Sequence, residues 1–280
     1  MRARKRLFHI SIYLVLIALG LIMVYPLLWM FFGTFKENRE LFGSMRLLPE
    51  HFSFRAYVEG WNNAGTVTFG TFFRNSFLLT IPTVLFTVLS SLLVAYGFTR
   101  FQFPLKNVLF AMMIGTMMLP SSVVLIPRYI LFRDFRWLNT YLPFYVPALF
   151  ACSAFFVFMM VQFMRGIPRT LDESAFIDGA GTFTTFWHIL FPLCKPAIFS
   201  VIIIQFIWTW GDFTNSLIFI NSVTKYPLSL GLRIAMDGLS KVNWNQILAM
   251  STLSILPPVL LFFSAQEYFV EGIATTGIKG

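Results

Sequence analysis

Charged side chains are scarce in this sequence. Asp, Glu, Lys and Arg make up only 12% of the 280 residues, whereas 57% of the residues are hydrophobic and 35 are phenylalanine. A soluble domain carries roughly 25% charged residues. The polar side chains present here are too few to cover the surface of a water-soluble protein of this length. The composition therefore excludes an ordinary soluble fold and indicates a chain with most of its surface in lipid.

Residues suited to catalysis or metal binding are also few. The three histidines, His9, His51 and His188, are far apart, and no CxxC, HExxH or Ser/His/Asp pattern accompanies them. Two cysteines, Cys152 and Cys194, provide neither a disulfide framework nor a zinc site. A membrane enzyme would need acids, bases or metal ligands that converge near the membrane. We therefore expect no catalytic residues and no metal site.

A nucleotide-binding loop is absent as well. The pattern GxxxxGK[S/T], whose backbone and lysine hold the phosphates of ATP, does not occur in the sequence. If ATP drives this protein, another polypeptide must bind it. No cofactor is expected in the chain itself.

The net charge of +9 comes from Lys and Arg residues that lie between long apolar runs and not on one helical face. In a soluble protein a positive charge of this size would suggest a nucleic acid partner. Basic residues between apolar runs instead anchor the chain at the membrane surface. We therefore expect membrane lipid, and no nucleic acid, as a partner.

Long apolar runs dominate what is present. A helix needs about 20 mostly apolar residues to cross a hydrocarbon core of roughly 30 Å. Six runs qualify, approximately Phe8–Phe32, Ser76–Tyr96, Val108–Pro127, Leu142–Phe163, Ala197–Ile218 and Gln246–Ala265, and only the fifth carries a charge, Asp212. The runs lack the alternation of barrel strands, and lipid cannot satisfy free backbone groups. The predicted fold class is all-α, a polytopic membrane protein with six transmembrane helices.

The N-terminus combines a basic start with the first apolar run. This run is about twice as long as that of a signal peptide and no AxA-like site follows it, so it is expected to stay attached as an anchor. The totals of Lys and Arg on the two sides of the membrane do not decide the orientation. A compact basic cluster, Arg2, Arg4, Lys5 and Arg6, lies directly before the first helix. The cluster favours cytoplasmic N- and C-termini.

The connection at about residues 165–196 carries too many structural signals for a simple linker. Thr170 and Glu173 have the spacing of a capping box, which predicts the start of a short helix. Gly179 is expected to end that helix after Asp178. The connection is therefore predicted to begin with a short, well-defined helix.

A second helical run is expected in the same connection, from about Thr184 to Leu190, stopping before Pro192. Small residues in the first helix allow another backbone to approach closely. They are Ser174, Ala175, Gly179 and Ala180. The two short helices together are suited to docking against a partner.

These residues resemble the EAA loop of ABC importer permeases. The stretch that carries the resemblance contains Glu173, Ser174, Ala175, Asp178, Gly179, Ala180, Phe186, Ile189, Pro192, Leu193 and Pro196. The sequence departs from the pattern at Ser174, the second residue of the triplet, and at Phe191, where Leu is expected. In that family the loop is cytoplasmic and lies in a cleft of the ATP-hydrolysing subunit. The resemblance implies ATPase coupling by Glu173, Ser174, Ala175, Asp178, Gly179 and Ala180, and a cytoplasmic N-terminus.

Other segments are similar to the carbohydrate branch of that family, the maltose-permease type. They are Tyr96–Lys106, Leu138–Tyr141 and Gly272–Gly280, so the resemblance extends over nearly the whole chain. It implies the type I ABC importer permease fold. It also implies a single transmembrane permease domain over residues 1–280, with core helices at about 76–265.

Two acidic residues of the loop have simpler explanations that remain open. The capping-box position of Glu173 would account for this residue without any partner, although one carboxylate oxygen could still meet a basic group. Asp178 could serve only to end a helix before Gly179. Glu173 could both cap a helix and couple to the ATPase. For Asp178, helix capping and ATPase coupling both remain open.

A polar and aromatic group lies near the presumed outer end of the fifth helix. Its members are Gln205, Trp208, Trp210, Asp212 and Asn215. Aromatic faces and hydrogen-bonding groups suit sugar rings and their hydroxyls, so the group is a candidate substrate path. Tryptophan is also common at membrane interfaces, and Asp212 could simply bond another helix. Both interpretations remain open.

The resemblance implies a permease subunit of a bacterial plasma membrane importer that moves a sugar or oligosaccharide by alternating access. The expected partners are a second permease, different from but similar to this chain, two copies of an ATPase that binds ATP and Mg²⁺, and an extracytoplasmic solute-binding protein. A non-sugar solute such as glycerol phosphate is one alternative. An ion-driven transporter is another, but such proteins usually carry several intramembrane charges and internal repeats, and here only Asp212 lies within an apolar run.

Overall fold

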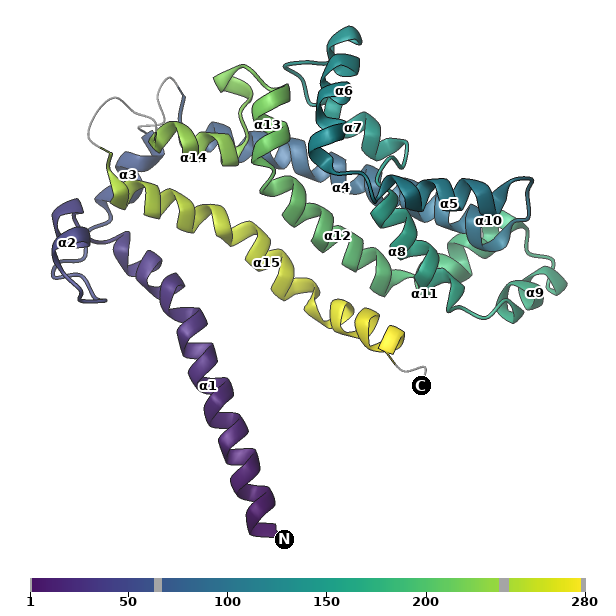
Figure 1. Cartoon of the computed structure of the whole chain (residues 1–280), viewed down its shortest axis with the longest axis horizontal. Coiled ribbons are helices and arrows are strands. Elements are labelled where there is room, and N and C mark those ends of the chain that lie inside the picture. The colour runs from purple at the N-terminus through teal and green to yellow at the C-terminus, as the bar shows by residue number, and fades with distance from the viewer. Residues whose placement is uncertain (1, 63–66, 237–241, 278–280) are drawn as a thin grey trace. The chain divides into compact units, whose positions relative to one another are not determined.

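A computed structural model describes residues 2–62, 67–236 and 242–277 of the chain. All regular elements in these residues are helices, and no β-strand is present among them (Figure 1). The predicted all-α fold class is confirmed.

The chain forms two compact units. One contains residues 1–70 and 231–256, and the other contains residues 71–230 and 257–280. The single permease domain expected over residues 1–280 stays a prediction.

The first unit joins residues from both ends of the chain. Its elements are α1 (Arg2–Gly33), α2 (Asn38–Gly43), α3 (Arg55–Asn62), most of α14 (Leu228–Met236) and the first part of α15 (Trp244–Gly277). Asn38 donates a hydrogen bond to the side chain of Asn243 at 3.0 Å, and Gln246 donates to Glu59 at 2.8 Å. The apolar stretch of α1 is not buried within the chain. This surface is suited to lipid.

The second unit contains the remaining helices. They are α4 (Phe69–Arg100), α5 (Lys106–Thr116), α6 (Ser121–Asp134), α7 (Leu142–Leu149), α8 (Ala154–Arg165), α9 (Thr170–Ile177), α10 (Thr182–Thr185), a π-helical turn (Phe186–Leu190), α11 (Phe191–Leu193), α12 (Lys195–Trp210), α13 (Phe213–Phe219) and a short 3₁₀ turn (Val223–Lys225). Figure 1 shows α9 and α10 at one end of this unit and α13 at the other end of α12.

The core of the second unit lies among α4, α8, the π-helical turn and α12. Its most deeply buried side chains include Leu92, Phe156, Val161, Met164, Leu190 and Val201. Among the described side chains, α9 contributes no member to this core cluster. Polar contacts must therefore contribute much of what positions α9.

Within the described part of the chain, four helical segments are long and apolar enough to cross a membrane, His9–Gly33, Phe69–Arg100, Leu142–Arg165 and Trp244–Glu267. Two bent pairs raise the number to six if each pair counts as one span. The predicted six spans agree with this upper count.

The third predicted span, Val108–Pro127, is wrong as a continuous helix. The structure breaks it between Thr116 and Ser121 with a bend of 102°, and α6 then continues through Pro127 to Asp134. Pro120 stands directly before α6. A proline disfavours helical angles for the residue before it and lacks the N–H that a continuous helix would use, so a break is favoured at this position.

The fifth predicted span, Ala197–Ile218, also differs. The helix α12 ends at Trp210, and Asp212 begins a separate helix, α13. Gly211 lies between them, and an aspartate favours a helix start because its side chain caps free backbone N–H groups.

In the fourth predicted span the helix is interrupted after Leu149, where Ala151 adopts a φ of 55°.

Candidate functional site

The short helix α9 begins differently from the prediction. Its N-cap is Arg169, which has helical backbone angles and no side-chain cap, so Thr170 lies inside the first turn. The predicted capping box of Thr170 and Glu173 is therefore wrong, because a capping side chain needs an extended N-cap residue. Glu173 is left exposed, and its carboxylate is not used as a cap.

The end of α9 agrees with the prediction. Gly179 has a φ of +83°, its N–H donates to Phe176 O at 3.1 Å, and the N–H of Ala180 donates to Ala175 O at 2.8 Å. These two bonds form a Schellman motif, in which glycine adopts the left-handed conformation at low cost. The chain turns sharply after Asp178 for this reason.

The second helical run is longer than predicted. It starts at Thr182, passes through the π-helical turn Phe186–Leu190 and continues as α11 to Leu193. The predicted stop before Pro192 is wrong, because Pro192 occupies the first turn of α11. A proline is tolerated there, since its missing N–H needs no partner within that helix.

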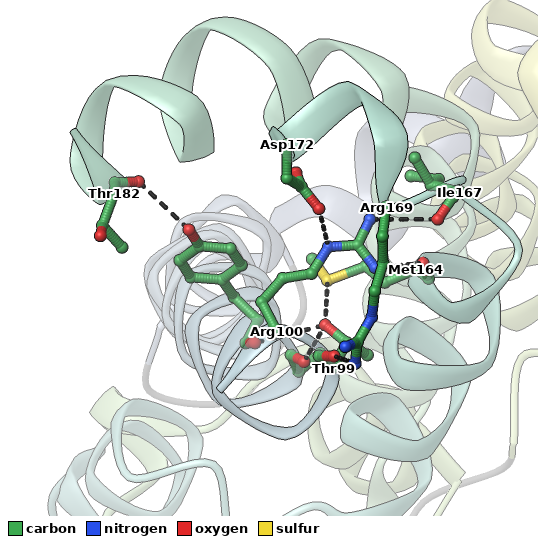
Figure 2. A network of polar contacts seen from close by, with 9 residues as sticks. Thr99, Arg100, Met164, Ile167, Arg169, Asp172 and Thr182 are labelled. Carbon is green, nitrogen blue, oxygen red and sulfur yellow. Dashed lines mark hydrogen bonds and ion pairs between the residues drawn. The ribbon is translucent and has the colours of Figure 1, made fainter. Parts of the chain in front are cut away.

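Arg100, the last residue of α4, joins three elements (Figure 2). Its Nε atom lies 2.6 Å from Oδ2 of Asp172 in α9. Its Nη1 donates to Met164 O at 3.4 Å and its Nη2 donates to Ile167 O at 3.2 Å, both at the end of α8. One guanidinium group thus connects α4, α8 and α9.

Two further hydrogen bonds tie the last turn of α4 to the segments on either side of α9. Arg169, just before α9, donates to Thr99 O at 2.8 Å. Thr182, beyond the turn after α9, accepts a bond from Tyr96 Oη at 3.1 Å (Figure 2). The helix α9 is therefore attached to α4 before, within and after its own length.

The Arg100–Asp172 ion pair lies in an environment that disfavours charge. The two side chains are 9% and 11% exposed. Burial raises the pKa of the Asp172 carboxyl, and Arg100, followed by Arg169, offsets only part of this shift. Neither carboxylate oxygen accepts a regular hydrogen bond from the described residues. Such a pair contributes little net stability, so its value lies in positioning α9.

The predicted coupling residues are distributed over two sides of α9 and its turn. Ala175 is buried, Ala180 is half-buried, and Glu173, Ser174, Asp178 and Gly179 are exposed. Glu173 also lines a pocket of about 190 Å³ with Asp172, Arg100 and Phe176. The structure thus brings Glu173 into the pocket that Arg100 lines. Ser174, Asp178 and Gly179 are exposed and do not line this pocket.

Three residues were missed by sequence reasoning. Arg100 and Asp172 are far apart in the sequence, and only their opposite charges at the ends of an apolar helix and a loop helix could have indicated the pair. Ile177 is 86% exposed, an unusual value for an isoleucine beside the predicted coupling residues. Its apolar character directly before Asp178 was the available signal.

The candidate substrate path divides into separate groups. Trp208 is exposed and packs against Phe155 and Phe156, with ring centroids at 5.1 and 5.3 Å. Gln205, three residues earlier on the same helical face, donates to Thr209 Oγ1 at 2.9 Å. These two residues lie together on α12.

Trp210 is buried and packs against the buried Phe206 and the exposed Phe77, at centroid distances of 5.3 and 4.8 Å. Asp212 caps α13 by accepting hydrogen bonds from the backbone N–H and the side-chain Nδ2 of Asn215, at 3.1 and 2.8 Å. The structure therefore places Asp212 and Asn215 together, apart from Trp210. Their part in a substrate path stays a prediction.

The cap predicts a difference between two substitutions. Asp212→Ala should lower the stability of the purified protein complex by about 1 kcal/mol, because the first turn of α13 loses its acceptor. Asp212→Asn keeps an acceptor oxygen and should lower the stability by a few tenths of that amount. Thermal unfolding curves measure both effects. Equal melting temperatures for the two variants would contradict a capping role.

Among the residues described here, no group of three His, Cys, Asp or Glu could hold a metal ion. The polar contacts of this end of the molecule instead involve arginine, aspartate and backbone carbonyls. This arrangement can hold helices together.

The sequence and the fold match known proteins. Residues 87–275 match the family model for the binding-protein-dependent transport system inner membrane component. The arabinooligosaccharides transport system permease protein AraQ of Bacillus subtilis is 30% identical, with 98% of this chain and 96% of the relative covered. The sn-glycerol-3-phosphate transport system permease protein UgpE of Yersinia pestis is 28% identical, with 96% and 97% covered.

A solved structure has the same fold. It is a chain of a bacterial ABC transporter involved in the import of the acidic polysaccharide alginate, with a TM-score of 0.83, 21% identity, and coverage of 95% of this chain and 97% of that chain. The chain studied here therefore belongs to the family of binding-protein-dependent transport system inner membrane components, the permease subunits of ABC importers.

Proposed function

We propose that this chain forms part of the membrane pathway of an importer for a sugar or oligosaccharide, and that α9 couples it to an ATPase. The family description, a binding-protein-dependent transport system, supports a solute-binding protein as a partner, and we infer an ATP-hydrolysing subunit as another. We assign two ATPase copies, which bind ATP and Mg²⁺, and a second permease chain similar to this one. The membrane is the bacterial plasma membrane, and both termini lie in the cytoplasm.

The observation that carries the coupling proposal is the threefold attachment of α9 to α4. Arg100, Thr99 and Tyr96 lie in the last two turns of α4 and hold α9 and its flanks. A displacement of α9 by a closing ATPase dimer is therefore passed to α4, one of the long apolar helices. ATP and loaded binding protein favour the outward-open state because they interact better with it than with the inward-open state.

The exposed side of α9 supplies the docking surface. Phe176 is 53% exposed and Ile177 is 86% exposed, next to the exposed Ser174 and Glu173. Apolar side chains exposed together beside polar ones are typical of a protein interface. In this proposal they enter the cleft of the ATPase, and Glu173 remains available for a basic group because it caps no helix.

The carbohydrate assignment rests on α12 and on the relatives. Trp208 presents an exposed aromatic face, and Gln205 provides an amide one turn away. Such pairs bind sugar rings by stacking and by hydrogen bonds to hydroxyls. AraQ, whose name specifies arabinooligosaccharides, supports this substrate class, whereas UgpE keeps a phosphorylated polyol as the alternative.

Site-directed crosslinking tests the coupling proposal. Cysteines at Ser174 and Ile177, in a Cys152→Ser background, should crosslink to the ATPase subunit in membranes, because both side chains are exposed on α9. Thr214→Cys is the matched control, since Thr214 is exposed on α13 at the opposite end of α12. Immunoblots of the crosslinked products measure the result.

Equal crosslinking at Thr214, or none at Ser174 and Ile177, would contradict the assignment. A membrane-impermeant thiol reagent that labels Ser174→Cys from outside intact cells would contradict the orientation. Uptake that persists after ATP depletion and stops when the ion gradient collapses would instead support an ion-driven transporter.

The substrate class is tested on the cognate binding protein. A rise in its melting temperature with a defined oligosaccharide, and none with glycerol phosphate, amino acids or oxyanions, would support the sugar assignment. A shift with glycerol phosphate alone would replace it by the alternative that UgpE suggests.

A further inference from the structure

A second pocket, of about 670 Å³, lies where α4 and α8 end and α5 begins. Four of its lining residues are basic, Arg100, Lys106, Arg165 and Arg169, and none of its lining residues is acidic. Coupling to an ATPase through α9 uses only Arg100 and Arg169 of these four. The accumulation of positive charge around an open volume therefore needs a separate explanation.

Most of this charge is not neutralised. Arg100 is paired with Asp172, but Lys106, Arg165 and Arg169 have no ion-pair partner among the described side chains. The ammonium group of Lys106 donates a hydrogen bond to Phe101 O at 2.7 Å. The guanidinium carbon of Arg165 lies 4.8 Å from the centroid of the Phe110 ring, a contact with the ring face that leaves the N–H groups at its edge available.

The backbone adds to the positive electrostatic potential of the pocket. The helix α5 begins at Lys106, and its first turn has no side-chain cap. The positive end of an 11-residue helix thus faces the region that Lys106 and Asn107 line. The opposing negative end of α8 is partly satisfied, because Arg100 donates to Met164 O and Ile167 O. Backbone and side chains both favour an anion.

The surface beside the pocket indicates what kind of anion. No residue of α5 is buried, and Val108, Leu109 and Met112, directly beyond the pocket, are 53%, 46% and 64% exposed. A soluble phosphate would make no contact with this apolar surface, whereas the acyl chains of a lipid would cover it. We propose that the pocket binds the phosphate group of an anionic phospholipid whose acyl chains lie along α5.

The negative lipids of the cytoplasmic leaflet would supply this ligand if this end of the chain lies in the cytoplasm, as proposed above. The bound lipid would hold α5 next to the α4–α9 contacts, whose Arg100 and Arg169 also line the pocket. The site differs from the substrate path and from the ATPase docking surface, because Lys106 and Arg165 belong to neither.

Native mass spectrometry of the complete purified importer tests this inference. Phosphatidylglycerol should remain bound under conditions that remove phosphatidylcholine with the same acyl chains. Lys106→Gln with Arg165→Gln should weaken phosphatidylglycerol binding by about 25-fold, at about 5-fold for each positive charge removed. The measurement uses neither uptake nor ATP hydrolysis, so a failure here leaves the coupling proposal standing.

The matched control is Arg133→Gln with Arg136→Gln, which removes two exposed positive charges at and just beyond the far end of α6. This control should keep the lipid affinity of the natural protein. Equal loss in both double variants, or equal retention of the two lipids, would overturn the inference. Displacement of phosphatidylglycerol by millimolar inorganic phosphate would point to a soluble anion instead. Loss of ATPase subunits from the pocket variant at unchanged lipid affinity would point to a protein contact.

Discussion

Replacing Arg100 with alanine is expected to reduce ATP-dependent uptake by at least about 100-fold. The substitution leaves the Asp172 carboxylate buried without its partner, a change that costs roughly 3–5 kcal/mol. It also removes the donors to Met164 O and Ile167 O. The helix α9 then loses its central attachment to α4. Uptake into proteoliposomes that contain the complete importer measures the loss.

A second variant separates positioning from stability. Arg100→Ala with Asp172→Asn removes the isolated buried charge, so much of the lost thermal stability should return. The connection from α4 to α8 and α9 is still missing, so uptake should stay low while ATP hydrolysis no longer responds to the binding protein. Recovery of uptake together with stability would show that the pair only stabilises the fold.

Replacing Gly179 with valine is expected to lower uptake by about 5- to 30-fold. At a φ of +83° a residue with a side chain costs about 1–2 kcal/mol, which corresponds to that factor, and a β-branched residue is the least tolerated. No atom beyond the glycine and its chain neighbours lies within 4 Å of the position where a Cβ would be, so we assign the expected effect to the backbone conformation. Uptake and crosslinking of Ser174→Cys should fall together.

Two controls accompany this variant. Gly179→Asn should retain most of the uptake, because asparagine enters the left-handed region more easily than other residues. Gly181→Ala should be almost neutral, since Gly181 has a φ of −76° and no atom within 4 Å of its Cβ position. Full activity of Gly179→Val would mean that the turn after α9 need not keep its shape.

The sequence was sufficient for the fold class, because composition and run length depend on the bilayer and not on contacts between distant residues. The end of α9 was predictable for a similar reason, since a glycine in a Schellman motif acts over a few residues. The resemblance to the EAA loop located the candidate site. The fold class, the end of α9 and the EAA-like loop could be predicted because each depends on residues that are close together in the sequence.

The errors have a different origin. The break at Pro120 and the separate helix after Asp212 lie inside runs whose hydrophobicity is continuous, so run length concealed them. The predicted capping box is wrong because Arg169 takes helical backbone angles. Arg169 donates a hydrogen bond to Thr99 O, and these two residues are far apart in the sequence. The Arg100–Asp172 pair was invisible for the same reason. Local signals at Pro120 and Asp212 decided the two breaks, whereas tertiary contacts decided the start of α9 and the ion pair.

The π-helical turn at Phe186–Leu190 has a consequence for the residues that follow it. A π turn holds one residue more than an α turn, and each residue of an α-helix advances about 100° around its axis. Deleting one residue from this turn would restore regular winding with little rotation of α11 relative to α10, because the wider π turn already accommodates the extra residue. Deleting one residue from the α-helical winding of α10 would instead rotate α11 by about 100°. The π turn thus takes up one surplus residue while the loop helices keep their angular alignment with the span beyond them.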